Sequence, residues 1–500
     1  MAECPTMGPA MTIIRGGRLL DSRTHTAEPA DIRIEGDTIA EVGRPGLAAP
    51  AGAPVIDARD TLMIPGLVNA HTHSHGNLGK SLGDRWTLEL LLNAGPWITG
   101  NRNLEEKQLS ALLGAMEMVQ KGCTAAYDLF YEFPAPALEG LEAVGRAYAE
   151  VGMRAVIAPM MADQTIYDAV PGLLEGVPQI RSRVQKFQLP PWEVSLAAAR
   201  KALEGWKLDA EGVSLALAPT IPLHCSDAFM TGCRDLAREF GAGLHMHVAE
   251  SKIQAMAGLT RYGKSLTAHL DELGLLGPNF TAAHAIWIDG DDMQRLADRG
   301  ASVAHNPGSN MRLGSGLAAA RLMLGRGVNV GIGTDTPTCS DNLNMFEAMR
   351  MASFVSRVQT PDYTRWLATD EVVSLATAGS ARALGRGDQL GRIAPGFKAD
   401  ITFLDLGHVN YLPLNDPTNQ VVHVEDGTGV QSVMIGGRLV LDHGRLTTVN
   451  VAAVRRRVEQ AVERLRAVNA PARALADELE PLIGTFCRGL SAREYPEVRR

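Results

Sequence analysis

Residues 65–73 read PGLVNAHTH, a short apolar run that ends in two histidines separated by one residue. If the run is a β-strand, His71 and His73 point to the same face, because side chains alternate along a strand. Two imidazoles at a strand end are typical ligands of a divalent metal. A pair of solvated loop histidines is the simpler interpretation of this motif alone, so the rest of the chain must decide between the two.

Three further apolar runs end in side chains that bind metals. These runs are residues 245–250 (HMHVAE), 281–284 (TAAH) and 331–335 (GIGTD). Their ends carry His247, His284 and Asp335, and Glu250 lies just beyond the first of them. Four strand ends with this set of side chains are hard to obtain by chance, so we predict a metal site. His245 lies two residues before His247, on the same face of the expected strand but deeper in the barrel. We interpret it as a supporting or packing residue.

The order of the apolar runs predicts the fold. From residue 65 to residue 385, eight short apolar runs alternate with longer helical patterns, as in an α/β protein with a (β/α)8 TIM barrel. The expected strands are residues 67–69, 125–128, 154–158, 214–218, 243–248, 281–283, 302–304 and 329–331. In such a barrel the catalytic side chains lie at the C-terminal ends of the strands.

Segments outside the barrel predict two further parts. Residues 1–64 and 386–450 read as short strands broken by Gly, Asp and Pro, and together they predict one small β-sandwich. Residues 451–500 are rich in Arg and Glu and predict a helical extension, either a cap or an oligomer contact. Residues 163–193 form an insertion after the third barrel strand, where a lid over the catalytic rim is one interpretation.

Composition excludes several classes of protein. With 48 basic and 56 acidic residues the net charge is −8, which argues against a nucleic-acid-binding protein. The share of apolar residues, 45%, is that of a globular chain rather than a disordered one. Six scattered cysteines without a CxxC motif indicate a reducing cytoplasm. We see neither a signal peptide nor an apolar run long enough to cross a membrane.

The motifs together resemble the amidohydrolase superfamily, in the branch of the triazine hydrolases, guanine deaminase and the adenosylhomocysteine deaminases. The resemblance covers about residues 11–450 and is carried by PGLVNAHTH, HMHVAE, AAHAIWI, AHNPGSNMRLGSG, GIGTDTPTCSDNLNMFEAMR and GRIAPGFKADI. It implies that one divalent metal per chain, with zinc as the first choice and Fe²⁺ as the alternative, is held by His71, His73, His247 and Asp335. It also implies a homodimer or a larger homo-oligomer.

The same resemblance assigns catalytic roles. It makes Glu250 the group that moves protons, and His284 an added metal ligand or a contact of the reacting water. The chemistry agrees, because a metal lowers the pKa of bound water toward neutrality and a nearby carboxylate such as Asp335 can accept or orient its proton. Residues 213–226, around the fourth strand, contain no lysine, which disfavours the two-metal branches of the superfamily that use a carboxylated lysine.

The substrate pocket departs from that of the adenosylhomocysteine deaminases. Thr220 stands where those relatives carry a histidine, residues 158–161 (APMM) lack their arginine, and TPTC at residues 336–339 replaces GAAS. These changes remove charge and predict a flat, weakly charged heterocyclic or aryl substrate. Met160, Met161 and Phe187 are candidates for an adaptable apolar wall.

Four further residues are candidate substrate contacts, each with a structural alternative. Cys339 is either a substrate contact or a buried inert thiol. Trp86 and Trp97 either line the pocket or pack, and His305 with residues 306–310 either contacts substrate or fixes a loop. We therefore predict a cytoplasmic hydrolase that cleaves a C–N bond at an sp² carbon of a heterocycle and releases ammonia. The alternatives are release of an amine or halide or cleavage of an amide or carbamate, and, more remotely, a non-catalytic relative.

Overall fold

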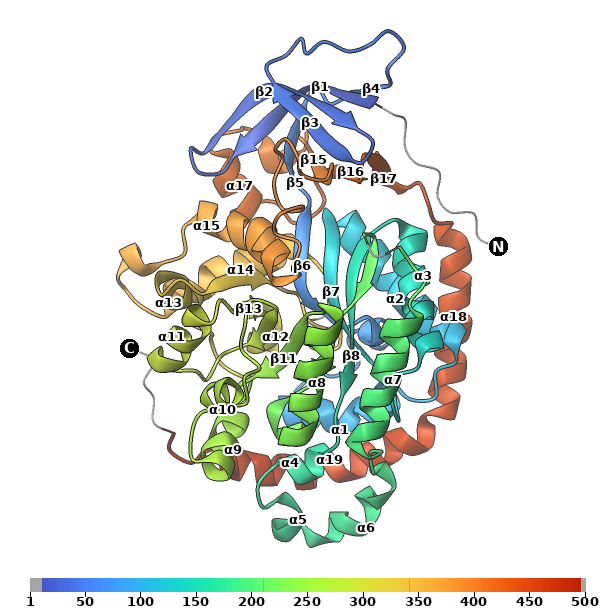
Figure 1. The fold of residues 1–500 in the computed structure, drawn as a ribbon, viewed down its shortest axis with the longest axis vertical. Helices are drawn as coiled ribbons and strands as arrows, with labels where there is room; N and C mark the ends of the chain where they lie inside the picture. The colour runs from blue at the N-terminus through green and yellow to red at the C-terminus, as the bar shows by residue number, and fades with distance from the viewer. Residues whose placement is uncertain (1–10, 210, 341, 496–500) are drawn as a thin grey trace.

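The computed structural model describes residues 11–209, 211–340 and 342–495. Each expected barrel strand is present, and the fourth is split into two short strands (Figure 1). The barrel strands are β6 (Leu67–Thr72), β7 (Cys123–Tyr131), β8 (Arg154–Met161), β9 (Val213–Leu215), β10 (Ala218–Pro219), β11 (Leu244–Val248), β12 (Phe280–His284), β13 (Ser302–His305) and β14 (Asn329–Ile332). The Cys4 thiol and the outermost parts of the predicted segments 1–64 and 451–500 lie outside the described residues.

These strands form two parallel sheets that meet at both edges. One sheet has the order β10-β8-β7-β6 with β9 beside β8, and the other has the order β11-β12-β13-β14. Parallel bridges between Leu217 and Leu244 and between Thr72 and Asp335 join the edges. The predicted (β/α)8 barrel is therefore confirmed, and its closing contact lies between the first strand and the segment after the last.

Helices pack around the barrel, across one of its ends and against the sheet that the terminal segments form. They are α1 (Leu88–Ile98), α2 (Leu104–Gln120), α3 (Leu138–Val151), α4 (Ile166–Ala169), α5 (Leu173–Gly176), α6 (Arg181–Val184), α7 (Trp192–Gly205), α8 (Asp227–Phe240), α9 (Lys252–Tyr262), α10 (Leu266–Glu272), α11 (Gly290–Asp298), α12 (Pro307–Arg312), α13 (Ala320–Gly325), α14 (Met345–Val358), α15 (Thr369–Ser374), α16 (Ser380–Ala383), α17 (Pro417–His423), α18 (Val451–Val468) and α19 (Ala470–Ser491). None of these helices is both long enough and apolar enough to cross a membrane.

The two terminal segments share one nine-stranded sheet, at the top of Figure 1. Its strands are β1 (Met11–Asp21), β2 (Thr26–Glu35), β3 (Thr38–Gly43), β4 (Val55–Asp57), β5 (Thr61–Pro65), β15 (Ile401–Asp405), β16 (Val430–Ile435), β17 (Arg438–Asp442) and β18 (Arg445–Leu446). The antiparallel pairing of β5 with β15 joins the two halves. Because β5 leads directly into β6, the strands begin beside this sheet and end at the opposite side of the barrel. The exact domain boundaries stay a prediction.

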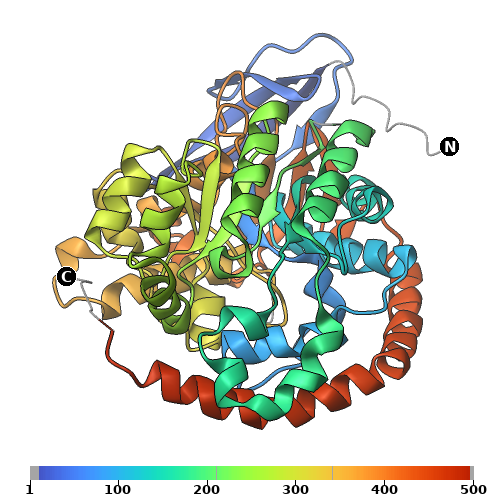
Figure 2. The same cartoon turned by 60° about the horizontal axis from the view of Figure 1, so that its bottom comes forward.

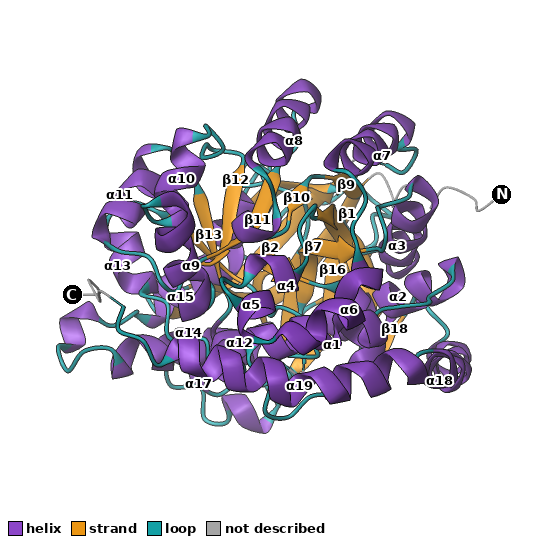
Figure 3. Cartoon of the chain, turned by 90° about the horizontal axis from the view of Figure 1, so that it is seen from below, coloured by secondary structure: helices purple, strands orange, loops and turns teal. Residues whose placement is uncertain are grey.

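The C-terminal extension wraps around the barrel and crosses its catalytic end (Figures 2 and 3). Helix α19 packs against α1, and it shares one apolar cluster with the insertion at residues 163–193. Tyr167 and Leu173 of the insertion lie in that cluster with Leu479 and Ile483 of α19, all of them buried. Helix α19, which lies in the segment predicted to be a cap or an oligomer contact, therefore holds the insertion in place.

Glycine allows the last strand to approach the first. A Cβ atom on Gly333 would lie 2.8 Å from both the backbone oxygen and the Cβ of His71. On Gly331 it would lie 2.9 Å from the Cβ of Ala70. Real Cβ atoms do not approach other atoms this closely, so any side chain here would push β14 away from β6.

We expect Gly333→Ala to lower the free energy of unfolding by about 1–3 kcal/mol, the usual cost of overpacking a tight interior. Thermal and urea denaturation measure the loss. Gly489→Ala is the matched control, because a Cβ added there in α19 meets no atom within 4 Å; it should be neutral or slightly stabilising. Equal stability of the two variants would show that this contact tolerates a side chain.

Candidate metal centre and substrate cavity

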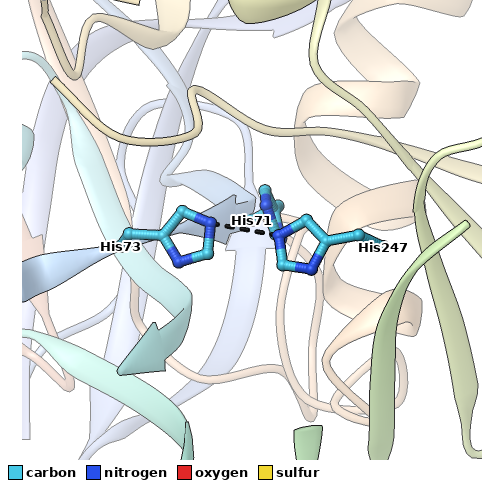
Figure 4. A group of neighbouring side chains, drawn as sticks. All are labelled: His71, His73 and His247. Carbon is cyan, nitrogen blue, oxygen red and sulfur yellow. Dashed lines mark hydrogen bonds between the residues drawn. The ribbon is translucent and has the colours of Figure 1, made fainter. Parts of the chain in front are cut away.

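Three histidine rings meet at the C-terminal end of the barrel. His71 lies in β6, His73 directly follows that strand and His247 lies in β11, and all three are buried. The Nε2 atoms of His73 and His247 lie 3.2 Å apart, and one ligand atom from each of the three residues lies within 4.8 Å of the others. Figure 4 shows the rings of His73 and His247 pointing toward one another, with His71 near the same point.

Hydrogen bonds on the far side of two rings fix their tautomers. The Nδ1 atom of His73 lies 2.7 Å from the backbone oxygen of Leu129, and that of His247 lies 2.8 Å from the backbone oxygen of Thr220. A carbonyl only accepts, so each Nδ1 carries the hydrogen and each neutral ring has a lone pair on Nε2. Two such lone pairs at 3.2 Å repel one another unless a cation lies near both.

His71 adds a third donor. Its Nε2 atom is buried and has no hydrogen-bond partner in the described part of the chain. Its Nδ1 atom lies 3.2 Å from Nε2 of His245, which agrees with the interpretation of His245 as a supporting residue. Burial lowers the pKa of His71 to about 3, so the ring is neutral and free to bind a metal. This orphaned nitrogen and the facing pair of His73 and His247 fit a divalent ion.

Asp335 completes this group from the segment after β14. Its Oδ1 atom lies 3.1 Å from Nε2 of His73 and 3.6 Å from Nε2 of His71, and it accepts a hydrogen bond from the backbone N–H of Thr336. Burial by itself would raise the pKa of Asp335, but the adjacent imidazoles of His71 and His73 outweigh it and hold the pKa well below its usual range. The residue has a φ of +62°, a strained conformation that here coincides with the site.

Glu250 and His284 lie on the other side of Asp335. The Nε2 atom of His284 is 3.6 Å from Oε2 of Glu250 and 3.8 Å from Oδ2 of Asp335. Burial, with the nearby carboxylates of Asp335 and Glu89, raises the pKa of Glu250 well above its usual range. Two buried carboxyl groups therefore differ in protonation, with Asp335 ionised and Glu250 able to donate a proton.

A cavity of about 570 Å³ leads to this site, and its lining is mainly apolar. The metal side is formed by His73, His247, Glu250, Asp335, Thr220 and Cys339. The apolar side includes Leu88, Leu91, Leu92, Ile98, Phe130, Phe133, Met160, Ile166, Tyr167, Phe187, Leu189 and Ile221. Met160 and Phe187 lie where the predicted apolar wall requires them, whereas Met161 is buried in the protein core.

The structure places three of the candidate substrate contacts elsewhere. Trp86, Trp97 and His305 are not among the described residues that line the cavity. The Trp86 indole donates to Oε2 of Glu480, and Arg473 lies over the ring of Trp97, so both indoles face α19. His305 is buried and neither of its ring nitrogens has a hydrogen-bond partner in the described chain. Thr220 and Cys339 line the cavity, and their contact with substrate stays a prediction.

Several cavity residues were not singled out from the sequence. Phe130 and Tyr131 end the second barrel strand, and Ile221 follows the fourth, so their strand-end positions were the signal that could have found them. Lys107 and Glu132 line the cavity as an ion pair. The two residues share no sequence motif, so no signal in the sequence could have paired them.

Comparisons with known proteins agree with this geometry. The amidohydrolase family profile matches residues 62–440. A 5-methylthioadenosine/S-adenosylhomocysteine deaminase from Syntrophobacter fumaroxidans is 32% identical over 461 residues, which cover 90% of this chain and 95% of the relative. A 5'-deoxyadenosine deaminase from Methanothermobacter thermautotrophicus is 32% identical over 455 residues, covering 91% and 98%.

Solved structures show the same fold. A zinc-bound adenosine deaminase from Xanthomonas campestris has a TM-score of 0.80 and 26% identity, and the match covers 91% of this chain and 98% of that one. A zinc complex of an atrazine chlorohydrolase from Arthrobacter aurescens has a TM-score of 0.81 at 23% identity, covering 90% and 100%. These matches and the donor set support a divalent metal at the site.

We expect His73→Ala to lose the bound metal, because it removes one of the two facing Nε2 atoms. Elemental analysis of the purified protein measures this as metal per chain. His75→Asn is the control, since His75 is the next histidine along the chain and its Nδ1 accepts from the backbone N–H of Tyr131; it should keep its metal. Full metal content in His73→Ala would remove this residue from the ligand set.

Proposed function

Because this chain belongs to the amidohydrolase family, we propose that it is a metal-dependent aminohydrolase that replaces an amino group on an sp² carbon of a nitrogen heterocycle and releases ammonia. The observation that carries the proposal is the pair of buried carboxyl groups, Asp335 and Glu250, which both lie within 3.8 Å of Nε2 of His284 beside the metal donors. The names of the relatives, which are deaminases of adenosine-like compounds, support it.

In this proposal His71, His73, His247 and Asp335 hold one zinc ion per chain. Such an ion supplies positive charge that lowers the pKa of a nearby water toward neutrality. Asp335 orients that water, and its Oδ2 atom accepts a proton from it. His284 lies within 3.8 Å of the same oxygen and keeps the water in place. The mainly apolar cavity excludes bulk water, which strengthens each of these interactions.

Glu250 then transfers protons between water and substrate. It donates its proton to the ring nitrogen next to the reacting carbon while the water oxygen bonds to that carbon. The amino group gains the proton that Asp335 took from water, its bond to carbon breaks, and ammonia leaves. The hydroxyl proton on the same carbon returns to Glu250 as the ring carbonyl forms. Water and the aminated heterocycle are consumed, and ammonia and the oxygenated heterocycle are produced, so atoms and charge balance.

The cavity wall supports a heterocycle with an apolar substituent. Thr220 and Cys339 flank the reacting end with uncharged groups, and the insertion adds mainly apolar or aromatic side chains, Ile166, Tyr167 and Phe187 among them, beside the uncharged Gln164 and Thr165. A substituent that reaches this wall gains contact area without the need for a charge partner. The predicted weakly charged substrate is thus part of the proposal.

Two further properties belong to the proposal. We place the protein in the cytoplasm, because the described cysteines Cys123, Cys225, Cys233, Cys339 and Cys487 are all free thiols. A homodimer or larger homo-oligomer follows from the family resemblance, and analytical ultracentrifugation tests it.

Glu250→Gln should lower kcat by about 10²-fold or more, because general acid–base groups contribute on that scale. The variant keeps its metal, since the facing imidazoles are intact. Steady-state kinetics and elemental analysis measure the two effects. Glu459→Gln, on the solvent side of α18, is the matched control and should behave as the parent. Undiminished turnover in Glu250→Gln would exclude Glu250 as the proton-transfer group.

The substrate class is tested by ammonia release from the purified zinc-loaded protein. The panel contains purines, pterins, pyrimidines and triazines, each with an apolar and with a charged substituent. We expect release from one class, with higher kcat/KM for the apolar member. Activity on amides or carbamates without ammonia release from any heterocycle would overturn the proposed function.

A further inference from the structure

The turn after β13, residues 305–310 (HNPGSN), is buried behind the catalytic site. Asn306, Ser309 and Asn310 are at most 1% exposed, and none of the three is among the described residues that line the cavity. They therefore lie too deep for direct contact with substrate. A turn fixed only for stability would not need so many buried polar side chains, because each one that lacks a partner is costly.

Asn310 sets the tautomer of His284. The Nδ1–H group of His284 donates to Oδ1 of Asn310 at 2.8 Å. In a neutral ring this leaves the lone pair on Nε2, the atom that faces Glu250 and Asp335. His284 has a φ of +69°, a conformation that persists only where the surroundings hold it. Asn306 adds a second contact, with its Nδ2 atom 3.4 Å from both ring nitrogens.

The other half of the Asn310 amide argues against a purely structural role. Its Nδ2 group is buried without a partner in the described chain. A leucine of similar size would avoid this cost, so stability alone does not account for an amide here. The acceptor on Oδ1 is the only part of the side chain that the described contacts use.

Ser309 reaches the second catalytic group through a thiol. Its Oγ atom lies 3.2 Å from Sγ of Cys339, and that thiol lies 3.4 Å from Oδ2 of Asp335. The two oxygens of Asp335 are thereby divided, with Oδ1 facing His71 and His73 and Oδ2 facing His284 and Cys339. Oδ2 is the oxygen that accepts the water proton in the proposed mechanism.

We propose that the first turn of α12 is a positioning device, in which Asn310 orients the ring of His284 and Ser309, through Cys339, orients the outer oxygen of Asp335. The inference rests on the proposed function, since it assigns the support of that same site. One rigid turn then places two groups from different strands around one water. A small misplacement of such groups strongly lowers the reaction rate, so a support shared by both groups favours catalysis.

Asn310→Leu tests the first arm. We expect kcat to fall by about 10- to 100-fold, the usual range for groups that support a metal site, with KM and metal content unchanged. Asn310→Asp retains an acceptor opposite Nδ1 and should recover most of the rate. Met311→Ala is the control, because Met311 is the next residue in α12 and its side chain is 43% exposed. An unchanged kcat in Asn310→Leu, or a rise in KM alone, would overturn this arm.

A second measurement needs no substrate. Nitrogen NMR of the zinc-loaded protein, with ¹⁵N-labelled histidine and a His284→Gln variant for assignment, reports which ring nitrogen of His284 carries hydrogen. We expect the Nδ1–H form in the parent and its loss in Asn310→Leu. An Nε2–H form in the parent would refute the inference even if deamination is found. The expected tautomer without deamination would instead place the failure in the proposed function.

The second arm is tested by a double-mutant cycle. Cys339→Ala should lower kcat by about tenfold or more, Ser309→Ala by less, and the double variant should be no slower than Cys339→Ala, because groups in one chain of contacts are not additive. Cys339→Ser, which still has a donor, should restore activity. Additive effects, or a Cys339→Ala variant with normal kcat, would overturn the link from Ser309 to Asp335.

Discussion

The approach of the last barrel strand to the first is the contact on which the site depends. The backbone N–H of Asp335 donates to the oxygen of His71, and the Thr72–Asp335 bridge closes the ring of strands. These hydrogen-bonded contacts thus join a carboxylate and a pair of imidazoles that are more than 260 residues apart in the chain. Gly333 makes them possible by leaving room for the backbone of β6.

Once the barrel is closed, burial determines the chemistry. Asp335 lies beside two imidazoles, which hold its pKa below the usual range, whereas burial and the neighbouring carboxylates raise the pKa of Glu250. One low-dielectric pocket therefore holds two carboxyl groups, of which one is suited to accept a proton and the other to donate one. Glu89 contributes to this difference from α1, where it accepts a hydrogen bond from Ser251, the residue after Glu250.

The strand ends could be predicted from the sequence because their signals are local. The alternation that places His71 and His73 on one face, and the polar residue that follows each apolar run, need no knowledge of distant parts. The positions of Trp86 and Trp97 could not be predicted in this way, because α19 packs against them from almost 400 residues further along the chain. The orientation of the Asn310 side chain could not be predicted either, because a six-residue helix has too few turns to show which of its faces is buried.

The position of helix α19 in the sequence determines when during synthesis it can dock on the barrel. All the proposed metal ligands lie between residues 71 and 335, but Ala472 of α19 lines the cavity and the same helix anchors the insertion that forms its apolar wall. A chain still on the ribosome can therefore assemble its metal donors before it can enclose a substrate. Full enclosure of the cavity waits until α19 has emerged and docked.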